Sequence, residues 1–167
     1  MVIPQPYIEE ESWRQILESV SDPEIPVLSV LDLGVVREMK RDGDGVLVKL
    51  TPTYSGCPAM DTMAADIVMA MGKAGIKTKV ELVLSPAWST DWLSENGKLK
   101  LEKYGVAAPL SESQDKRALL DGERLVKCTN CQSTNTKLIS QFGSTACKAL
   151  FQCNECLEPF DYFKCLV

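Results

Sequence analysis

The chain has 167 residues, 45% of them hydrophobic and 25% charged, which is typical of a globular protein with one core or two small ones. Eighteen basic and 23 acidic side chains give a net charge of −5, which argues against a nucleic-acid binder held mainly by phosphate contacts. The chain has no histidine, so Ser-His-Asp triads, Cys-His pairs and His-bearing metal sites are also excluded. No apolar run approaches the roughly 20 residues of a transmembrane helix and no secretory signal pattern is present, so we expect a cytoplasmic protein without membrane contact.

The first part of the chain, residues 1–105, predicts an α+β domain. Apolar residues at helical spacing predict an amphipathic helix over residues 9–20, and SDPEIPVLSVLDLG predicts an ordered loop because of its two prolines. VVREMKR and VLVKLTPT around the turn DGDG predict a hairpin, AMDTMAADIVMAMGKAG a second helix, and KTKVELVL a third strand. With a further short helix after SPAWSTDW, this order predicts a small mixed sheet covered by helices on one face.

The rest of the chain predicts a linker and a second, smaller module. Residues 106–122 are polar and lack clear periodicity, so we expect them to form the linker. Residues 123–167 predict an all-β module of four short strands, RLVK, TKLISQF, KALFQ and FDYFK. About forty residues in four strands bury little apolar core, so this module needs a cross-link that stabilises its fold.

Two CxxC pairs can supply that cross-link, Cys128 with Cys131 and Cys153 with Cys156. Two-residue spacing lets two thiolates converge on one ion from a tight turn, and two such turns complete a tetrahedron. The 21 residues between the pairs exceed the usual interval by one, which a hairpin can absorb. We therefore expect a zinc-ribbon-like domain in which structural zinc binding is coupled to folding.

The spacing leaves alternatives to zinc open. Two disulfides would use the same four cysteines, but nothing marks the chain as secreted. An iron–sulfur cluster is another all-thiolate site, and Cys147 and Cys165 are spare cysteines that could serve it or simply pack as small apolar side chains. A thiol redox enzyme is a weaker alternative, since its CxxC motif normally opens a helix of a βαβ unit.

Cys57 stands apart from the other six cysteines, at a junction between strand and helix. Because Pro58 suits the first helical position, Cys57 falls at or near the helix N-cap, where free amides and the helix dipole predict a lowered thiol pKa. Asp22 and Glu24 of the preceding loop could help this thiolate hold a metal. The alternatives are a cysteine packed under the loop and carboxylates that only shape a turn.

These segments together resemble known families. DPEIPVLSVLDLGVV and the strand that ends in TPTYSGCP resemble the metal–sulfur cluster assembly family, whose members serve iron–sulfur protein maturation in the cytosol. SPAWSTDWLSENGKLKLEKYGVAAP and FGSTACKALFQCNECLEPFDYFKC resemble the accessory proteins of bacterial phenylacetyl-CoA epoxidase, and that resemblance covers essentially the whole chain.

The resemblance implies a role in aerobic phenylacetate catabolism, an aromatic-compound degradation pathway. There an oxygenase with a di-iron component epoxidises phenylacetyl-CoA, served by a flavin and iron–sulfur reductase. This chain resembles neither component, because it lacks paired E-x-x-H motifs and a G-x-G-x-x-G fingerprint. An accessory factor that helps iron–sulfur or iron cofactor maturation is therefore implied, rather than a catalyst.

The same resemblance implies which residues act and with what. The functional cysteine would be Cys57, with Asp22, Glu24 and Thr53 beside it, and the tail cysteines would hold zinc. The implied partners are the oxygenase and reductase components, and a homodimer could share Cys57 between two copies. The alternative function is a non-catalytic structural subunit that bridges oxygenase and reductase.

Overall fold

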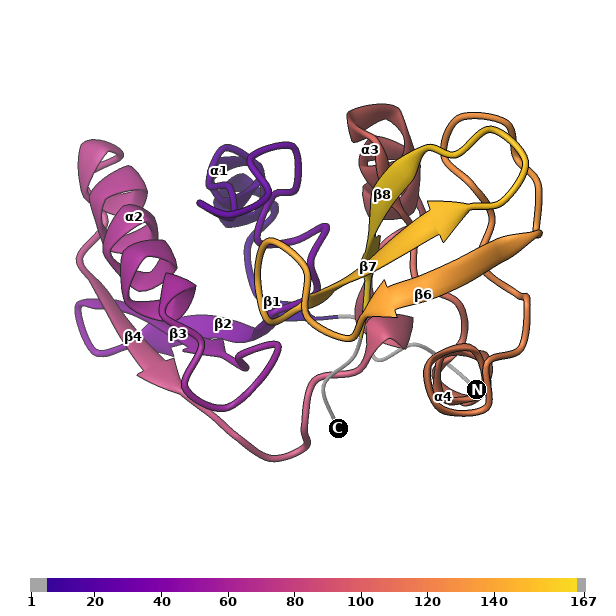
Figure 1. The fold of residues 1–167 in the computed structure, drawn as a ribbon. Coiled ribbons are helices and arrows are strands. Elements are labelled where there is room, and N and C mark those ends of the chain that lie inside the picture. The colour runs from indigo at the N-terminus through magenta and orange to yellow at the C-terminus, as the bar shows by residue number, and fades with distance from the viewer. Residues whose placement is uncertain (1–5, 165–167) are drawn as a thin grey trace. The chain divides into compact units, whose positions relative to one another are not determined.

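The computed structural model describes residues 6–164 (Figure 1). The chain divides into two compact units, the first formed by residues up to 88 together with 92–97, and the second by residues 89–91 and 98 onward. Among the described helices, none has the length and apolar character needed to cross a bilayer.

The first unit is a four-stranded mixed sheet with two helices on one face (Figure 1). The strand order is β1-β2-β3-β4, in which β2 and β3 are antiparallel and the two outer pairs are parallel. This confirms the predicted mixed sheet, and only the two-residue strand β1 has no counterpart in the prediction. The elements are β1 (Tyr7–Ile8), α1 (Glu11–Glu18), β2 (Val36–Asp42), β3 (Gly45–Leu50), α2 (Ala59–Lys73) and β4 (Thr78–Leu82).

Alternation along β3 separates the two faces of this sheet. Val46, Val48 and Leu50 are buried, whereas the residues between them are only partly covered. The helices bury the matching stripes, among them Leu17 of α1 and Ile67 of α2, both fully inaccessible to solvent. The opposite face is polar. There Glu38 forms an ion pair with Lys49 (N–O 2.8 Å), and a second with Lys40 (3.4 Å).

The loop between α1 and β2 is ordered, as its prolines predict. Ile25 and Leu28 of this loop are fully buried. The carboxylate of Asp22 accepts hydrogen bonds from the backbone N–H groups of Glu24 (2.6 Å) and Ile25 (3.2 Å), so it holds the DPEIP turn. Gly34 closes the loop with φ +72°, and a Cβ there would lie 2.3 Å from a backbone oxygen of Trp92.

The second unit contains a sheet of order β5-β8-β7-β6, in which β5 and β8 are parallel and the other pairs antiparallel. Three of the four predicted strands are present, but RLVK forms no strand, and the fourth place is taken by β5. The remaining elements of the chain are the 3₁₀ helix η1 (Thr90–Trp92), α3 (Glu95–Tyr104), β5 (Val106–Ala107), α4 (Glu112–Leu120), β6 (Thr136–Ser140), β7 (Lys148–Cys153) and β8 (Pro159–Phe163).

Strand β5 and helix α4 occupy the segment that the sequence predicts to be a linker. Helix α4 could not be predicted from hydrophobic periodicity, because its buried residues are Asp115 and Ala118 and these form no apolar stripe. Asp115 is only 2% exposed and accepts a hydrogen bond from the hydroxyl of Tyr162, which also accepts one from the backbone N–H of Leu110 (3.1 Å). A buried polar contact therefore attaches α4 to β8, and the unit carries a helix beside the predicted strands.

Candidate functional site

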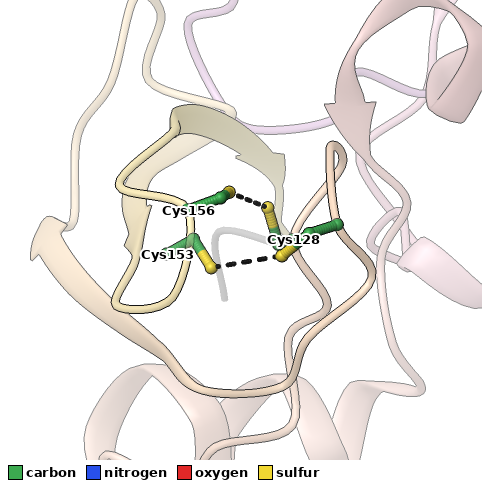
Figure 2. Close-up of side chains that lie close together, drawn as sticks. Cys128, Cys153 and Cys156 are labelled. Carbon is green, nitrogen blue, oxygen red and sulfur yellow. Dashed lines mark hydrogen bonds between the residues drawn. The ribbon is translucent and has the colours of Figure 1, made fainter.

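The two CxxC pairs lie in two similar turns. Cys128 and Cys131 precede β6, whereas Cys153 ends β7 and Cys156 lies between β7 and β8. In each turn the first cysteine's sulfur accepts a backbone N–H two residues on, from Asn130 in one turn (3.4 Å) and from the corresponding residue in the other (3.3 Å). The turns therefore direct sulfur atoms toward one point (Figure 2).

The sulfur geometry fits one tetrahedral metal ion. The Sγ atoms of Cys128 and Cys156 are 3.6 Å apart, those of Cys131 and Cys153 are 3.5 Å apart, and all four lie within 4.8 Å of one another. A tetrahedron with metal–sulfur bonds of ~2.3 Å has sulfur–sulfur edges of ~3.8 Å. Cys128 and Cys153 are fully buried, and Cys131 and Cys156 are exposed, so one side of the site is packed and the other faces solvent. These four cysteines are therefore placed to hold one metal ion.

Hydrogen bonding prepares this site for thiolates. The backbone N–H of Glu158, the side chain of Asn130 and the neighbouring cysteines lower the pKa of Cys156 to about 6. The pKa of Cys131 is raised, because the other thiols of the cluster outweigh the N–H that Ser133 donates to it. Cys156 therefore loses its proton readily, whereas Cys131 retains its proton unless a cation lies nearby.

Each turn contains a residue with left-handed backbone directly after its second cysteine, Gln132 with φ +63° and Leu157 with φ +64°. Neither is glycine, so each backbone carries a steric cost that glycine would avoid. We expect Leu157→Gly to raise the free energy of unfolding of the metal-loaded protein by about 0.5–1 kcal/mol, measured by thermal denaturation. Leu120→Gly is the control, since that exposed leucine lies in helix α4 and its loss should lower stability. A lower melting temperature for Leu157→Gly would contradict this account of the turn.

The spare cysteines are separate from this quartet as far as the structure describes them. Cys147 is buried, its sulfur lies 3.0 Å from the hydroxyl of Thr145, and its carbonyl accepts the backbone N–H of Lys164 (2.9 Å). Cys165 lies outside the described residues. Between residues 6 and 164, only the quartet gathers three or more cysteine or carboxylate groups within reach of one ion.

Cys57 lies in the first unit, on the segment that joins β3 to α2. Its N–H donates to the carbonyl of Tyr54 (3.2 Å), and its own carbonyl accepts the N–H of Met60 (3.3 Å). Cys57 lies directly before the N-cap, which is Pro58 rather than the predicted Cys57, so the cysteine is near the helix start as predicted. Gly56 has φ +80°, and a Cβ there would meet nothing within 4 Å. The approach past Gly56 is therefore open, and Cys57 itself is half-buried.

The three residues predicted to lie beside Cys57, namely Asp22, Glu24 and Thr53, have different roles in the structure. The Thr53 side chain hydrogen bonds the sulfur, and Glu24 lies close enough for its negative charge to act on it. Asp22 is instead occupied with the turn that it caps, the role that the sequence left open for it. The sequence analysis did not identify Tyr54, whose side chain also hydrogen bonds the Cys57 sulfur. Its position three residues before Cys57 in the same turn was the sequence feature that could have indicated it.

The predicted lowering of the Cys57 pKa is wrong. Burial raises the pKa of the thiol, and the charge of Glu24 adds to this effect. Hydrogen bonds from the N–H of Ala59 and the side chains of Tyr54 and Thr53 oppose it without reversing it. The helix start therefore does not outweigh desolvation, and Cys57 is a protonated thiol at neutral pH until a cation displaces its proton.

Comparison with known proteins places both units. Residues 11–82 match the family described as "Iron-sulfur cluster assembly protein", and residues 112–164 match the "PaaD zinc beta ribbon domain". The first unit is also similar to the crystal structure of a domain of unknown function, DUF59, from Bacillus anthracis, with 26% identity, a TM-score of 0.51, and coverage of 55% of this chain and 90% of that one.

Two relatives extend the comparison. An Fe-S protein maturation auxiliary factor of Porphyromonas gingivalis is 39% identical over 95 residues, 55% of this chain and 90% of the relative. A protein of Escherichia coli (strain K12), provisionally named as one of the subunits of 1,2-phenylacetyl-CoA epoxidase, is 47% identical over 157 residues, 93% of this chain and 92% of the relative. The chain therefore belongs to the PaaD family, in which an iron–sulfur cluster assembly domain precedes a zinc ribbon domain.

Proposed function

We propose that this chain is a cytoplasmic accessory factor for phenylacetyl-CoA epoxidase, and that it assists iron–sulfur cluster maturation of the complex rather than catalysing epoxidation. The observation that carries the proposal is the setting of Cys57, an accessible thiol with Thr53, Tyr54 and Glu24 around it, in a domain of the iron–sulfur cluster assembly family. Similarity over 93% of the chain to a relative named for this epoxidase supports the choice of complex.

The chemistry at Cys57 suits brief rather than permanent binding. A thiol with a raised pKa yields its proton when a soft cation binds, and the nearby Glu24 carboxylate favours the positive charge that arrives. One thiolate and one carboxylate leave an iron ion short of ligands, so the others must come from a client, from sulfide or from a second copy of the chain. Incomplete ligation allows the cargo to be passed on to the reductase or the oxygenase.

The ribbon has a different role in this proposal, that of a structural zinc module that docks on the client. A closed four-thiolate site of tetrahedral geometry is the arrangement that structural zinc prefers. Zinc here would hold a small sheet together and leave Cys57 as the residue for transient iron chemistry.

The test is a Cys57→Ser variant in cells that make the epoxidase complex. We expect iron and acid-labile sulfide per reductase to fall on the order of tenfold, because serine is a poor ligand for soft metal at this position. The measurement is metal and sulfide analysis of the purified complex. Circular dichroism of the variant should match the wild type, since the sulfur is only half-buried.

Ser55→Ala is the matched control, as this exposed neighbour lies in the same turn and has no part in the proposed chemistry. Its cluster content should equal that of the wild type. Full cluster loading with Cys57→Ser would remove the carrier role.

A second candidate function is favoured by the name of the Escherichia coli relative, which describes a subunit rather than a maturation factor. A structural subunit that bridges oxygenase and reductase would remain in the active complex in fixed proportion. A maturation factor would be dispensable once the clusters are in place. Activity of a complex stripped of this chain after maturation distinguishes the two.

A further inference from the structure

Strand β4 is an edge of the first unit's sheet. It pairs with β3 on one side, and no strand of the described chain pairs with its other side (Figure 1). The backbone of Lys77 and Val83 bonds toward β3, the former accepting from Val46 (2.8 Å) and the latter donating to Leu50 (2.7 Å). Because backbone groups alternate in direction along a strand, odd-numbered residues here bond to β3.

The even-numbered residues Thr78, Val80 and Leu82 consequently direct their N–H and C=O groups to the open edge. We propose that two copies of this chain pair antiparallel through β4, with a two-fold axis at Val80. In that register Val80 faces Val80 of the partner subunit and Thr78 faces Leu82 of the partner subunit, both as hydrogen-bonded pairs. Two sheets of four strands then form one continuous sheet of eight.

Charge complementarity selects this register and this partner. Lys79 and Glu81 are exposed and flank Val80 on the polar face of the sheet. Antiparallel pairing about Val80 places Lys79 opposite Glu81 of the partner subunit, and the two-fold axis repeats that pair. Both are non-hydrogen-bonded pairs, in which opposite Cα atoms approach to ~4.5 Å and side chains are closest. Like charges at these positions would block an edge, whereas this order of charges is complementary to itself.

The helix face adds apolar contact to the same edge. Leu82 is 49% exposed and Val68 of α2 is 41% exposed. On α2, Met69 and Lys73 line the groove between α2 and α1, and Ile67 faces the sheet. Successive helical residues are about 100° apart around the axis, so Val68 lies on the side of α2 away from α1. That side overlooks β4, since α2 contacts β4 and α1 contacts β1 at the other edge of the sheet. Pairing through β4 would therefore cover apolar side chains that otherwise face water.

This dimer would supply the second copy that could complete ligation at Cys57, but the pairing depends on the edge of β4 and the adjacent face of α2 and does not rest on the proposed function. Loss of pairing and loss of cluster delivery are separate measurements. A dimer without delivery, or delivery by a monomer, would tell the two proposals apart.

Sedimentation velocity of the full-length protein over a range of concentrations is the test. We expect a reversible dimer in the wild type. Lys79→Glu and Glu81→Lys should each weaken it by about tenfold or more, because two attractive pairs become repulsive. Lys103→Glu and Glu102→Lys are the matched controls, with the same charge changes at exposed positions of α3, and should leave the dimer unchanged.

Mixing the two single variants gives the sharper result. The copy with two acidic residues and the copy with two basic residues are complementary in this register, so an equimolar mixture should dimerise more tightly than either variant alone. Amide exchange should slow with concentration at Thr78, Val80 and Leu82, and not at Lys79 or Glu81, which already bond to β3. A monomer at all concentrations, or a dimer unaffected by both reversals, would overturn the proposal.

Discussion

Replacing Cys128 with serine is expected to release the metal and unfold the second unit while the first unit stays folded. A structural four-thiolate zinc site contributes roughly 10–16 kcal/mol of binding free energy to folding. Whole domains are stable by only about 5–15 kcal/mol, so losing one of the four ligands should remove most of the stability of this small unit. Cys128 is also fully buried in the same apolar core cluster as Phe151 and Tyr162, so an unpaired hydroxyl there adds to the loss.

The measurement is bound metal per chain together with the NMR spectrum of the variant, in which peaks of the second unit should collapse and those of the first unit persist. Cys147→Ser is the control, because Cys147 is buried in the same unit but lies outside the quartet. It should keep one metal ion per chain. A folded, metal-bound Cys128→Ser protein would show that the four cysteines do not hold the fold of the second unit together.

Tyr162→Phe is expected to lower the free energy of unfolding of the second unit by about 3 kcal/mol, the largest effect among changes that keep the metal. The hydroxyl donates to Asp115 and accepts from Leu110 N–H, and both groups lose a partner when it is removed. Asp115 is only 2% exposed, so water replaces the lost bond poorly. Tyr104→Phe, at a tyrosine that is 52% exposed, should change the stability by less than about 0.5 kcal/mol.

The pH dependence provides a second test of the same contact. Burial, and then the charge of Asp115, raise the pKa of Tyr162 above its ordinary value. The neutral phenol therefore stabilises the fold fully below the unfolded pKa of about 10, and the stability falls as the pH rises beyond that value. This alkaline decline should shrink in Tyr162→Phe. An equal decline in both proteins would assign it to other groups.

Sequence patterns were most informative where chemistry or periodicity is local. The CxxC spacing predicted the quartet, because each pair needs only one turn to bring its sulfurs together, and the ~3.8 Å edges expected of a tetrahedron match the observed distances of 3.5 and 3.6 Å. The two helices of the first unit follow from apolar residues at helical spacing, and its strands from alternation such as that of Val46, Val48 and Leu50 in β3.

Sequence patterns failed where a contact joins distant segments. Asp115 is a polar residue in a core position, and its partner Tyr162 lies 47 residues later, so the local pattern of α4 predicted a linker. The pKa of Cys57 was predicted with the wrong sign because burial by the surrounding chain cannot be read from a helix-start motif. The conformation of the folded loop also sets the different roles of two carboxylates. Asp22 caps a turn, whereas Glu24 lies close enough to the Cys57 thiol for its charge to act on it.

We propose that iron chemistry belongs to Cys57 and that Cys128, Cys131, Cys153 and Cys156 hold structural zinc. The most direct test of this proposal is zinc, iron and acid-labile sulfide analysis, with a visible spectrum, of anaerobically purified wild-type and Cys57→Ser protein. We expect one zinc per chain in both proteins, and any iron or sulfide only in the wild type. Iron and sulfide retained by Cys57→Ser, with no zinc, would contradict it and make the four-cysteine site itself the cluster carrier.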